Sequence, residues 1–327
     1  RFGCIAKVLQ HRPQIVIGLE FTTMTFFTAL FCRLFMPSTR VYTMCDDSLE
    51  VASTAGPVRR AGRRMCLALL DGLVLCNEPA QQWYAARFPR VRTIVSPIIQ
   101  DEERIGGIIR AARGISGEHA RRFGLQGKAV LLYVGRLTAV KNLGFLLEAF
   151  AMYAPAHPRA QLVLVGDGDK RKELEEQARR LGVAGRVVFA GRYEHRELYA
   201  WYPLADCFIL PSLWEPFGAV VNEALIAGVP VLCSSVAGAA CLVTPRNGRI
   251  ISPHDKQQLV EALSLALPDP PAAFDGAGQQ KPHWRKSAMP YSFGAKIGEL
   301  VMFLEQEKQG SDKKDRKNKL SQSNKQT

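Results

Sequence analysis

From residue 128 onward, short apolar segments alternate with amphipathic segments at regular intervals. The apolar segments have the length of buried strands, and the segments between them carry apolar residues at helical spacing. This alternation predicts a parallel sheet with helices on both faces, because parallel strands need crossover connections. We expect strands at 129–134, 161–165, 186–190, 207–210, 229–233 and 249–252, and helices at 142–153, 170–181, 195–202, 218–227 and 255–266.

The first hundred residues show the same alternation with fewer strands. We expect strands at 15–18, 40–44, 73–76 and 92–95, and helices at 23–35, 57–70 and 79–86. A complete doubly wound domain has about six strands. We therefore expect a second Rossmann-like domain that is incomplete here, with its opening strand and glycine loop missing from the amino end.

The segment from Glu215 to Glu223 joins a predicted strand to a predicted helix and carries a carboxylate at each end. Open α/β sheets bind ligands at the carboxyl ends of their strands, and carboxylates accept hydrogen bonds from sugar and ribose hydroxyls. Between them, the N–H groups of Gly218 and Ala219 open the helix and can hold a phosphate or hydroxyl. The alternative is an ordinary surface helix with an acidic first turn.

Two cations follow the predicted strand at 129–134. Arg136 and Lys141 are five positions apart, so both can converge on one anion across a tight turn. Two surface cations near a helix start are the alternative, which the helix dipole disfavours. Cations on one loop and carboxylates on another suit a ligand with a diphosphate in its middle and hydroxyls at its ends.

Taken in order, these residues resemble the carboxyl-terminal half of family 4 glycosyltransferases, which are retaining enzymes of the GT-B fold. The resemblance covers about residues 94–307. It rests on Gly-Arg-Leu at 135–137 with Lys-Asn at 141–142, Gly-Asp-Gly at 166–168, Phe-Ala-Gly at 189–191, Pro-Ser at 211–212 and the two glutamates.

The resemblance implies an α/β GT-B architecture, in which two Rossmann-like domains face a central cleft. Residues 1–100 would form the partial amino-terminal acceptor domain, and residues 101–290 the nucleotide-sugar-binding domain. A helix at 291–307 would cross back to the first domain, followed by a disordered basic tail at 308–327.

The resemblance also implies transfer of a sugar from a UDP- or GDP-linked donor to a saccharide or lipid-linked acceptor, with retention, in polysaccharide or glycoconjugate biosynthesis. The catalytic residues would be Arg136 and Lys141, which stabilise the leaving diphosphate, and Glu215, which contacts the donor sugar. Glu223 would bind the ribose. The other donor-binding residues would be Gly135, Gly191, Arg192, Phe217, Gly218 and Ala219.

Two positions depart from the family pattern. Cys45 stands where many relatives carry a histidine near the reacting sugar, and Cys241 stands where relatives often carry an acid. Asp46 or Asp47 could hold the sugar or acceptor instead; the alternative is a turn capped by an Asp side chain before the next helix.

Other activities compete with sugar transfer. They are a sugar-nucleotide epimerase of the same fold and a non-catalytic nucleotide-sugar-binding module. A dinucleotide oxidoreductase is disfavoured, because no G-x-G-x-x-G joins a first strand to a helix.

The net charge of +13 is unevenly placed. Residues 1–127 hold +7 and residues 281–327 hold +6, whereas residues 128–280 are neutral. A basic surface attracts an anionic membrane leaflet, so we expect a cytoplasmic protein that associates with the inner face of the membrane through charge, with no nucleic-acid partner. A solvated basic face that aids solubility is the alternative.

The eight cysteines form no C-x-x-C pair and lie mostly in apolar segments, as reduced thiols of a cytoplasmic protein do. The six histidines are scattered. We therefore expect no metal and no cofactor besides the nucleotide-sugar co-substrate. The apolar stretch at 21–36 is shorter than the roughly 20 residues that a membrane span needs.

Overall fold

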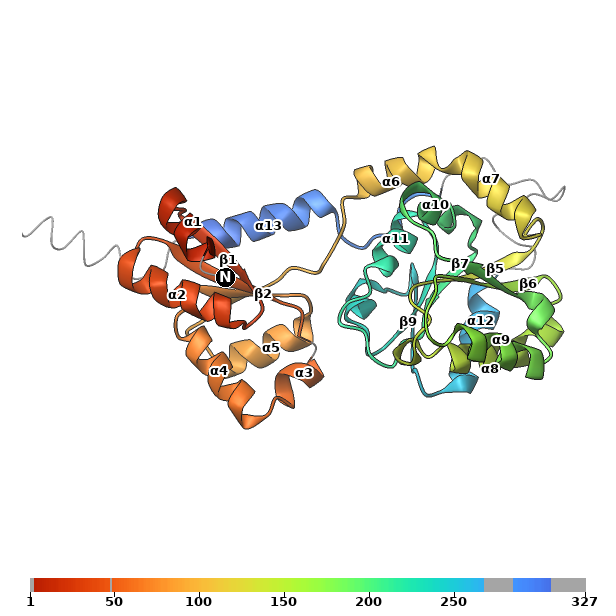
Figure 1. Ribbon diagram of the computed structural model, residues 1–327, viewed down its shortest axis with the longest axis horizontal. Coiled ribbons are helices and arrows are strands. Elements are labelled where there is room, and N and C mark those ends of the chain that lie inside the picture. The colour runs from red at the N-terminus through yellow and green to blue at the C-terminus, as the bar shows by residue number, and fades with distance from the viewer. Residues whose placement is uncertain (1–2, 48, 268–284, 307–327) are drawn as a thin grey trace, which may run out of the picture.

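The computed structural model describes residues 3–47, 49–267 and 285–306; the tail expected at 308–327 lies outside them. The chain forms two parallel sheets, each with helices against it, and Figure 1 shows them as two lobes. The predicted α/β architecture with two Rossmann-like units is confirmed.

The first sheet has four strands in the order β1-β2-β3-β4, all parallel. Leu73, Leu75 and Tyr84 are among the fully buried side chains of its core. The strands are β1 (Ile15–Leu19), β2 (Arg40–Cys45), β3 (Gly72–Leu75) and β4 (Arg92–Val95), and the helices are α1 (Gly3–His11), α2 (Thr23–Phe35), α3 (Leu49–Ser53), α4 (Pro57–Leu67) and α5 (Glu78–Arg87).

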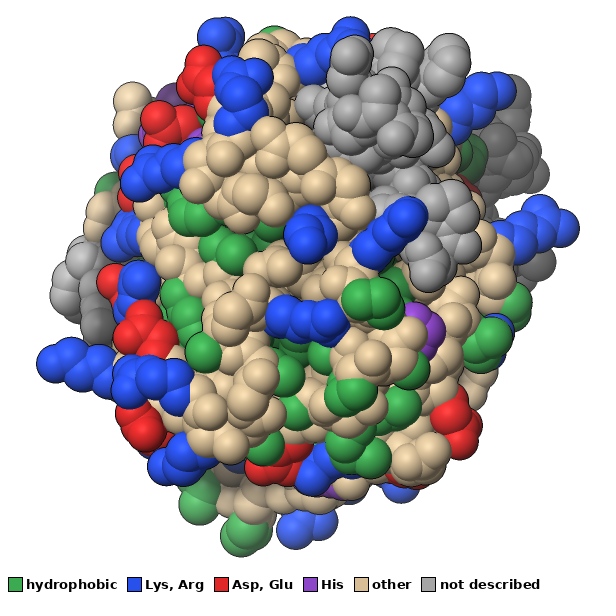
Figure 2. All heavy atoms as spheres, turned by 90° about the vertical axis from the view of Figure 1, so that its right-hand side faces the viewer, with side chains coloured by type: hydrophobic (Ala, Val, Ile, Leu, Met, Phe, Trp, Pro, Cys, Tyr) green, Lys and Arg blue, Asp and Glu red, His purple; other side chains and the backbone are tan. Residues whose placement is uncertain are grey.

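The second sheet has six parallel strands in the order β10-β9-β8-β5-β6-β7. Each lies within two residues of its predicted position. The strands are β5 (Ala129–Val134), β6 (Ala160–Val165), β7 (Val187–Gly191), β8 (Cys207–Leu210), β9 (Val231–Ser234) and β10 (Gly248–Ile251), and the helices are α8 (Leu143–Tyr153), α9 (Arg171–Arg180), α10 (His195–Tyr199), α11 (Val220–Ile226) and α12 (Lys256–Ala266). Figure 2 looks onto this domain from outside and shows basic side chains spread over the face, whereas acidic side chains lie mainly toward its rim.

Two further helices, which lie in the chain between the last strand of the first sheet and the first strand of the second, are not predicted by the sequence pattern. They are α6 (Glu102–Ala111) and α7 (Arg113–Arg122). Asp101 caps α6 by accepting hydrogen bonds from the N–H groups of Glu103 and Arg104, each at 3.0 Å. The paired glycines at 106–107 have low helix propensity, so the sequence pattern does not predict α6.

The last described helix, α13 (Phe293–Glu305), follows the second domain in sequence but packs on the first sheet (Figure 1). Its Phe303 and Leu304 join the core around Tyr42. The Tyr42 hydroxyl donates to the Leu304 carbonyl at 3.0 Å, and the Arg40 guanidinium donates to the Glu305 carbonyl at 2.8 Å. These bonds satisfy carbonyl groups that the end of a helix leaves open.

Candidate active site

The order of strands in the second sheet reverses between β5 and β8, which are direct neighbours. Helices leave such neighbouring strands toward opposite faces, so the carboxyl edge between them is where open α/β sheets bind ligands. The loop after β5 carries Arg136 and Lys141, and the loop after β8 carries Glu215. The fold therefore brings the predicted cation loop and the predicted carboxylate loop together.

At this edge the Lys141 ammonium pairs with the Glu215 carboxylate. Their side chains are only 14% and 12% exposed, and the Ser212 hydroxyl donates to the same carboxylate at 3.4 Å. The family resemblance assigns Lys141 to the leaving diphosphate and Glu215 to the donor sugar. The structure adds that each is the other's partner.

Asn142 fixes the loop that carries Lys141. Its backbone is left-handed, with φ of 59°, a conformation that Asn adopts more readily than most residues. Its side-chain amide donates to the carbonyls of Pro211 at 3.2 Å and Pro253 at 2.8 Å. In addition, the Leu213 N–H donates to the Val140 carbonyl at 2.8 Å. These bonds hold the loops after β5, β8 and β10 as one unit.

Arg136 is exposed beside this pair, and its backbone carbonyl accepts from the Tyr133 hydroxyl at 2.9 Å. Burial raises the pKa of Tyr133, the Glu215 charge raises it further, and the Arg136 charge lowers it. Both charges therefore lie near one buried phenol. The predicted convergence of both cations on one anion stays a prediction, since Lys141 is engaged by Glu215.

Glycines occupy the carboxyl ends of three adjacent strands, at 135, 166 and 191. The Gly166 N–H donates to the Gly191 carbonyl at 2.8 Å. A Cβ on Gly166 would lie 1.9 Å from the Gly135 carbonyl oxygen, so no side chain fits there. Gly135 and Gly191 thus border an edge where a ligand can approach the backbone closely. The next residue, Arg192, pairs with Glu194 at 2.6 Å and is 75% exposed.

Residues 217–219 lead into α11. Phe217 is buried and anchors the turn, and the Ala239 N–H donates to its carbonyl at 2.7 Å. Gly218 has φ of 94°, and a Cβ there would lie 2.6 Å from a methyl of Leu210. Within the described ranges, the N–H groups of Gly218 and Ala219 have no backbone acceptor, as the sequence predicts for a helix start.

Glu223 lies on α11 and is 8% exposed. Its carboxylate accepts from the hydroxyls of Tyr202 and Tyr199 and from the side chain of Gln100. Burial raises the pKa of Glu223, and these hydrogen bonds oppose the rise. The preceding Asn222 donates to the Ile98 carbonyl at 2.8 Å. The two predicted carboxylates thus have different partners, a lysine for Glu215 and the tyrosines and interdomain segment for Glu223.

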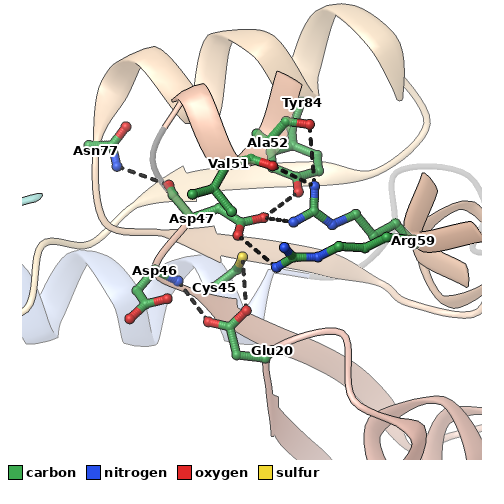
Figure 3. Close-up of polar contacts among 10 residues, drawn as sticks. Glu20, Cys45, Asp46, Asp47, Val51, Ala52, Arg59, Asn77 and Tyr84 are labelled. Atoms are coloured by element: carbon green, nitrogen blue, oxygen red, sulfur yellow. Dashed lines mark hydrogen bonds and ion pairs between the residues drawn. The ribbon is translucent and has the colours of Figure 1, made fainter. Parts of the chain in front are cut away.

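In the first domain, a polar cluster forms at the carboxyl ends of β1 and β2 (Figure 3). Glu20 follows β1 and has a left-handed backbone, with φ of 57°. Its carboxylate accepts from the Asp46 N–H at 3.0 Å and from the Cys45 thiol at 3.5 Å. Burial raises the pKa of Glu20, and the nearby carboxylates of Asp46 and Asp47 raise it further.

Asp47 turns into the protein, whereas Asp46 is half-buried. The Asp47 carboxylate pairs with the buried Arg63 and, at 3.6 Å, with Arg59. It also accepts from the Tyr84 hydroxyl at 2.9 Å, as Figure 3 shows. These partners occupy the Asp47 carboxylate, which therefore holds α4 and α5 against the end of β2. The Asp46 carboxylate makes none of these contacts.

A family model for "Glycosyl transferases group 1" matches residues 117–281, half of the chain. The chain belongs to this family. The resemblance to glycosyltransferases, which the motifs between residues 135 and 223 carry, is thereby confirmed. Among curated proteins, the chain is similar to glycogen synthase of Mycobacterium tuberculosis, with 36% identity over 204 residues, covering 62% of this chain and 47% of that protein.

It is also similar to 2-deoxystreptamine glucosyltransferase of Streptomyces kanamyceticus, with 31% identity over 219 residues, covering 65% of this chain and 56% of that protein. The chain thus spans about half the length of the curated relatives it matches. The structure of Anabaena Alr3699/HepE in complex with UDP superposes with a TM-score of 0.65 at 22% identity, covering 80% of this chain and 72% of that one. This likeness confirms the fold.

The group 1 family signature lies in the second domain, and the first-domain cluster falls outside it. No motif of the sequence pointed to Glu20. The sequence shows only that Glu20 directly follows a predicted strand, at whose carboxyl end a ligand could bind. The left-handed backbone of Glu20 cannot be predicted from the sequence.

Donor atoms of Glu20, Cys45 and Asp47 lie within 4.8 Å of one another, the one such group of potential metal ligands in the described ranges. The group suits a cation poorly. Arg63 and Arg59 already neutralise Asp47, and burial raises the pKa of Cys45 far above its usual range, which disfavours the thiolate that binds metals. The expectation of a metal-independent protein stays a prediction.

All eight cysteines are free thiols, and six are buried. Burial raises the pKa of Cys241 to about 11 and that of Cys66 to about 11, which keeps both thiols protonated at neutral pH. None of the helices that the structure describes is long and apolar enough to cross a membrane.

Proposed function

We propose that this protein transfers a sugar from a nucleotide-diphosphate donor, UDP- or GDP-linked, to a hydroxyl group of a saccharide or lipid-linked acceptor. The transfer proceeds with retention at the anomeric carbon and serves assembly of a polysaccharide or glycoconjugate. The Lys141–Glu215 pair at the β5–β8 switch point carries this proposal. Family membership and the glycosyltransferase relatives support it.

The difficult step is breakage of the anomeric C–O bond, during which negative charge grows on the leaving diphosphate. A fixed cation aimed at that charge is a large source of transition-state stabilisation. Lys141 is held in place by Asn142 and Glu215. A bound diphosphate replaces Glu215 as partner of the ammonium, and the released carboxylate accepts from a hydroxyl of the donor sugar. Arg136, exposed on the same loop, supplies the second cation.

Glu223 and the backbone hold the rest of the donor. Glu223 accepts from the ribose hydroxyls in place of its two tyrosine partners. The N–H groups of Phe217, Gly218 and Ala219 bind sugar hydroxyls and phosphate oxygens. Gly191 and Arg192, at the end of β7, border the base.

Thermal shift with UDP- and GDP-linked hexoses identifies the donor, because a ligand at about 100 times its dissociation constant adds about 2.7 kcal/mol to the free energy of unfolding. The matching donor is then incubated with simple glycosides and assayed for release of nucleoside diphosphate, and NMR gives the anomeric configuration of the product. A product of inverted configuration would contradict retention.

The same assay separates the alternatives. Conversion of the nucleotide sugar to its epimer without release of nucleoside diphosphate would indicate an epimerase. A donor that stabilises the protein and is neither transferred nor hydrolysed would indicate a binding module.

A further inference from the structure

The segment that joins the two domains is fixed against the second one. This linker, residues 96–101, runs from β4 to α6 (Figure 1). The side chain of Asn222 on α11 donates to the Ile98 carbonyl at 2.8 Å, and Ile99 packs against the core of the second sheet. Helix α6 then packs against α11. Gln100 therefore lies in a segment that the second domain holds in place on both sides.

Only one arm of the Gln100 amide group has a partner. The Gln100 side chain hydrogen-bonds to the Glu223 carboxylate. An ionised carboxylate only accepts, so the amide nitrogen is the donor and the oxygen Oε1 lies on the other arm of the same group. This Oε1 is buried and has no hydrogen-bond partner among the described residues. An unpartnered acceptor therefore lies next to Glu223.

Asn222, directly before Glu223, shows the same pattern. Its side chain is fully buried, its amide nitrogen donates to the linker, and its Oδ1 has no partner within the described ranges. Buried polar atoms are normally hydrogen-bonded, so each of these oxygens calls for a donor. The hydroxyls of Tyr199 and Tyr202 donate to Glu223 itself. The surroundings of Glu223 thus hold more acceptors than donors.

We propose that Gln100 determines specificity for the ribose of the donor. Its Oε1 accepts from one ribose hydroxyl while the Glu223 carboxylate accepts from the other. A ribose presents two donors on adjacent carbons, and the amide and carboxylate oxygens present two neighbouring acceptors. This inference rests on the proposed function, which assigns the ribose to Glu223, and it adds the linker to the donor site. A deoxyribose lacks one of the two donors, so the site selects ribonucleotides.

The burial of Oε1 makes this contact discriminating. A hydrogen bond to a ligand usually adds little affinity, because the acceptor exchanges a bond to water for the bond to the ligand. Oε1 has no partner to give up in the described part of the free protein, so the bond to ribose is gained without that exchange. We expect it to contribute about tenfold to affinity. Sites that hydrogen-bond a substrate hydroxyl strongly reject the analogue that lacks it.

The test measures affinities of the whole chain by calorimetry for UDP and GDP and for the 2′-deoxy and 3′-deoxy analogues of each. The readout is the dissociation constant of each analogue divided by that of its parent nucleotide. Gln100→Leu removes the amide group and keeps most of the side-chain volume. Gln81→Leu is the matched control, because Gln81 is also half-buried and donates to the Thr93 hydroxyl at 2.8 Å, in the first domain.

In the unchanged protein, both deoxy analogues of the nucleotide that binds should bind more weakly than their parent. In Gln100→Leu, one of the two ratios should fall about tenfold, toward one. The other ratio should persist, because Glu223 still holds the second hydroxyl. Gln81→Leu should keep both ratios, and circular dichroism should show both variants folded. A change in the fold would weaken binding of parent and analogue alike, so it cancels in the ratio.

Four results would overturn the inference. If both ratios are unchanged in Gln100→Leu, Oε1 does not contact the ribose. If both ratios fall together, Gln100 only orients the Glu223 carboxylate. Equal affinity of the unchanged protein for parent and analogues, or the same change in Gln81→Leu, would also refute it. Failure of both UDP and GDP to bind would refute the proposed function and this inference with it, whereas binding with unchanged ratios refutes this inference alone.

Discussion

Substitution of Asp47 by Asn should destabilise the first domain, even though the shape of the side chain is kept. Asp47 and Arg63 are 3% and 4% exposed and pair directly. Without the negative charge, the Arg63 guanidinium remains buried. Its other contacts are the carbonyls of Val51 and Ala52 at 3.3 Å and the Phe21 ring, whose centre lies 5.5 Å away, and its Nε already lacks a hydrogen-bond partner. Breaking one side of a buried ion pair costs about 3–5 kcal/mol.

Urea unfolding followed by tryptophan fluorescence measures this loss. Of the four tryptophans, Trp83 is the one in the first domain, and its ring lies 4.9 Å from that of Tyr84, which hydrogen-bonds to Asp47. With a slope of about 2 kcal/mol per molar urea, the midpoint should fall by about 1.5–2.5 M. Asp46→Asn is the control and should not lower the midpoint, because it removes a carboxylate that lies near that of Glu20 and makes no contact with Arg63.

Adding Arg63→Met to Asp47→Asn should recover part of the loss, since the unpaired charge is then gone. If Asp47→Asn unfolds at the midpoint of the unchanged protein, or if the double variant loses the sum of both single effects, the pair does not act as described. Asp47 would then be open again as an acceptor ligand.

Three further predictions concern the donor site. Lys141→Ala should lower turnover by about 10²–10³ with the fold retained, and initial rates of nucleoside diphosphate release near those of the unchanged protein would refute the role of the ammonium. Glu223→Gln should weaken binding of the nucleoside diphosphate itself, whereas Glu215→Gln should weaken only the sugar nucleotide; calorimetry that finds equal losses for both ligands in both variants would contradict this division. Burial raises the pKa of Glu223 above 4.5, so just above that pH Glu223 binds more protons in the folded protein than in the unfolded chain. The free energy of unfolding should therefore fall as the pH rises through this window. Urea midpoints between pH 4 and 7 should show a smaller fall for Glu223→Gln than for the unchanged protein, and an identical slope would rule out this contribution.

The second sheet could be predicted because each of its strands is a continuous apolar segment bounded by loop residues. The same holds for the two loops at the β5–β8 edge, since strand ends in a parallel sheet lie at one edge. What the sequence does not reveal is their partners. The Lys141–Glu215 contact spans 74 residues, and no local spacing reports it.

The first-domain cluster shows the same limit. Asp47 looks like a turn residue or an acceptor ligand in the sequence, and only the placement of α4 supplies Arg63. Glu20 carries no pattern at all, because its role depends on a left-handed backbone and on the neighbouring end of β2. Helix α6 is not predicted for a different reason. Asp101 is a good capping residue, but the glycines at 106–107 have low helix propensity, so the local signals disagree.

The position of α13 has a consequence for recombining such proteins. Gly72 of β3 lies beneath this helix, and a Cβ there would lie 2.9 Å from the Tyr42 ring and 3.0 Å from the Phe303 ring. The first domain is therefore built from two separate stretches of sequence, one before residue 96 and one after residue 292. A chimera that takes only the amino-terminal stretch from a relative would combine that relative's first sheet with the α13 of this protein, although the two did not evolve to pack together. The exchangeable unit is discontinuous, and a working hybrid should carry its own α13 along.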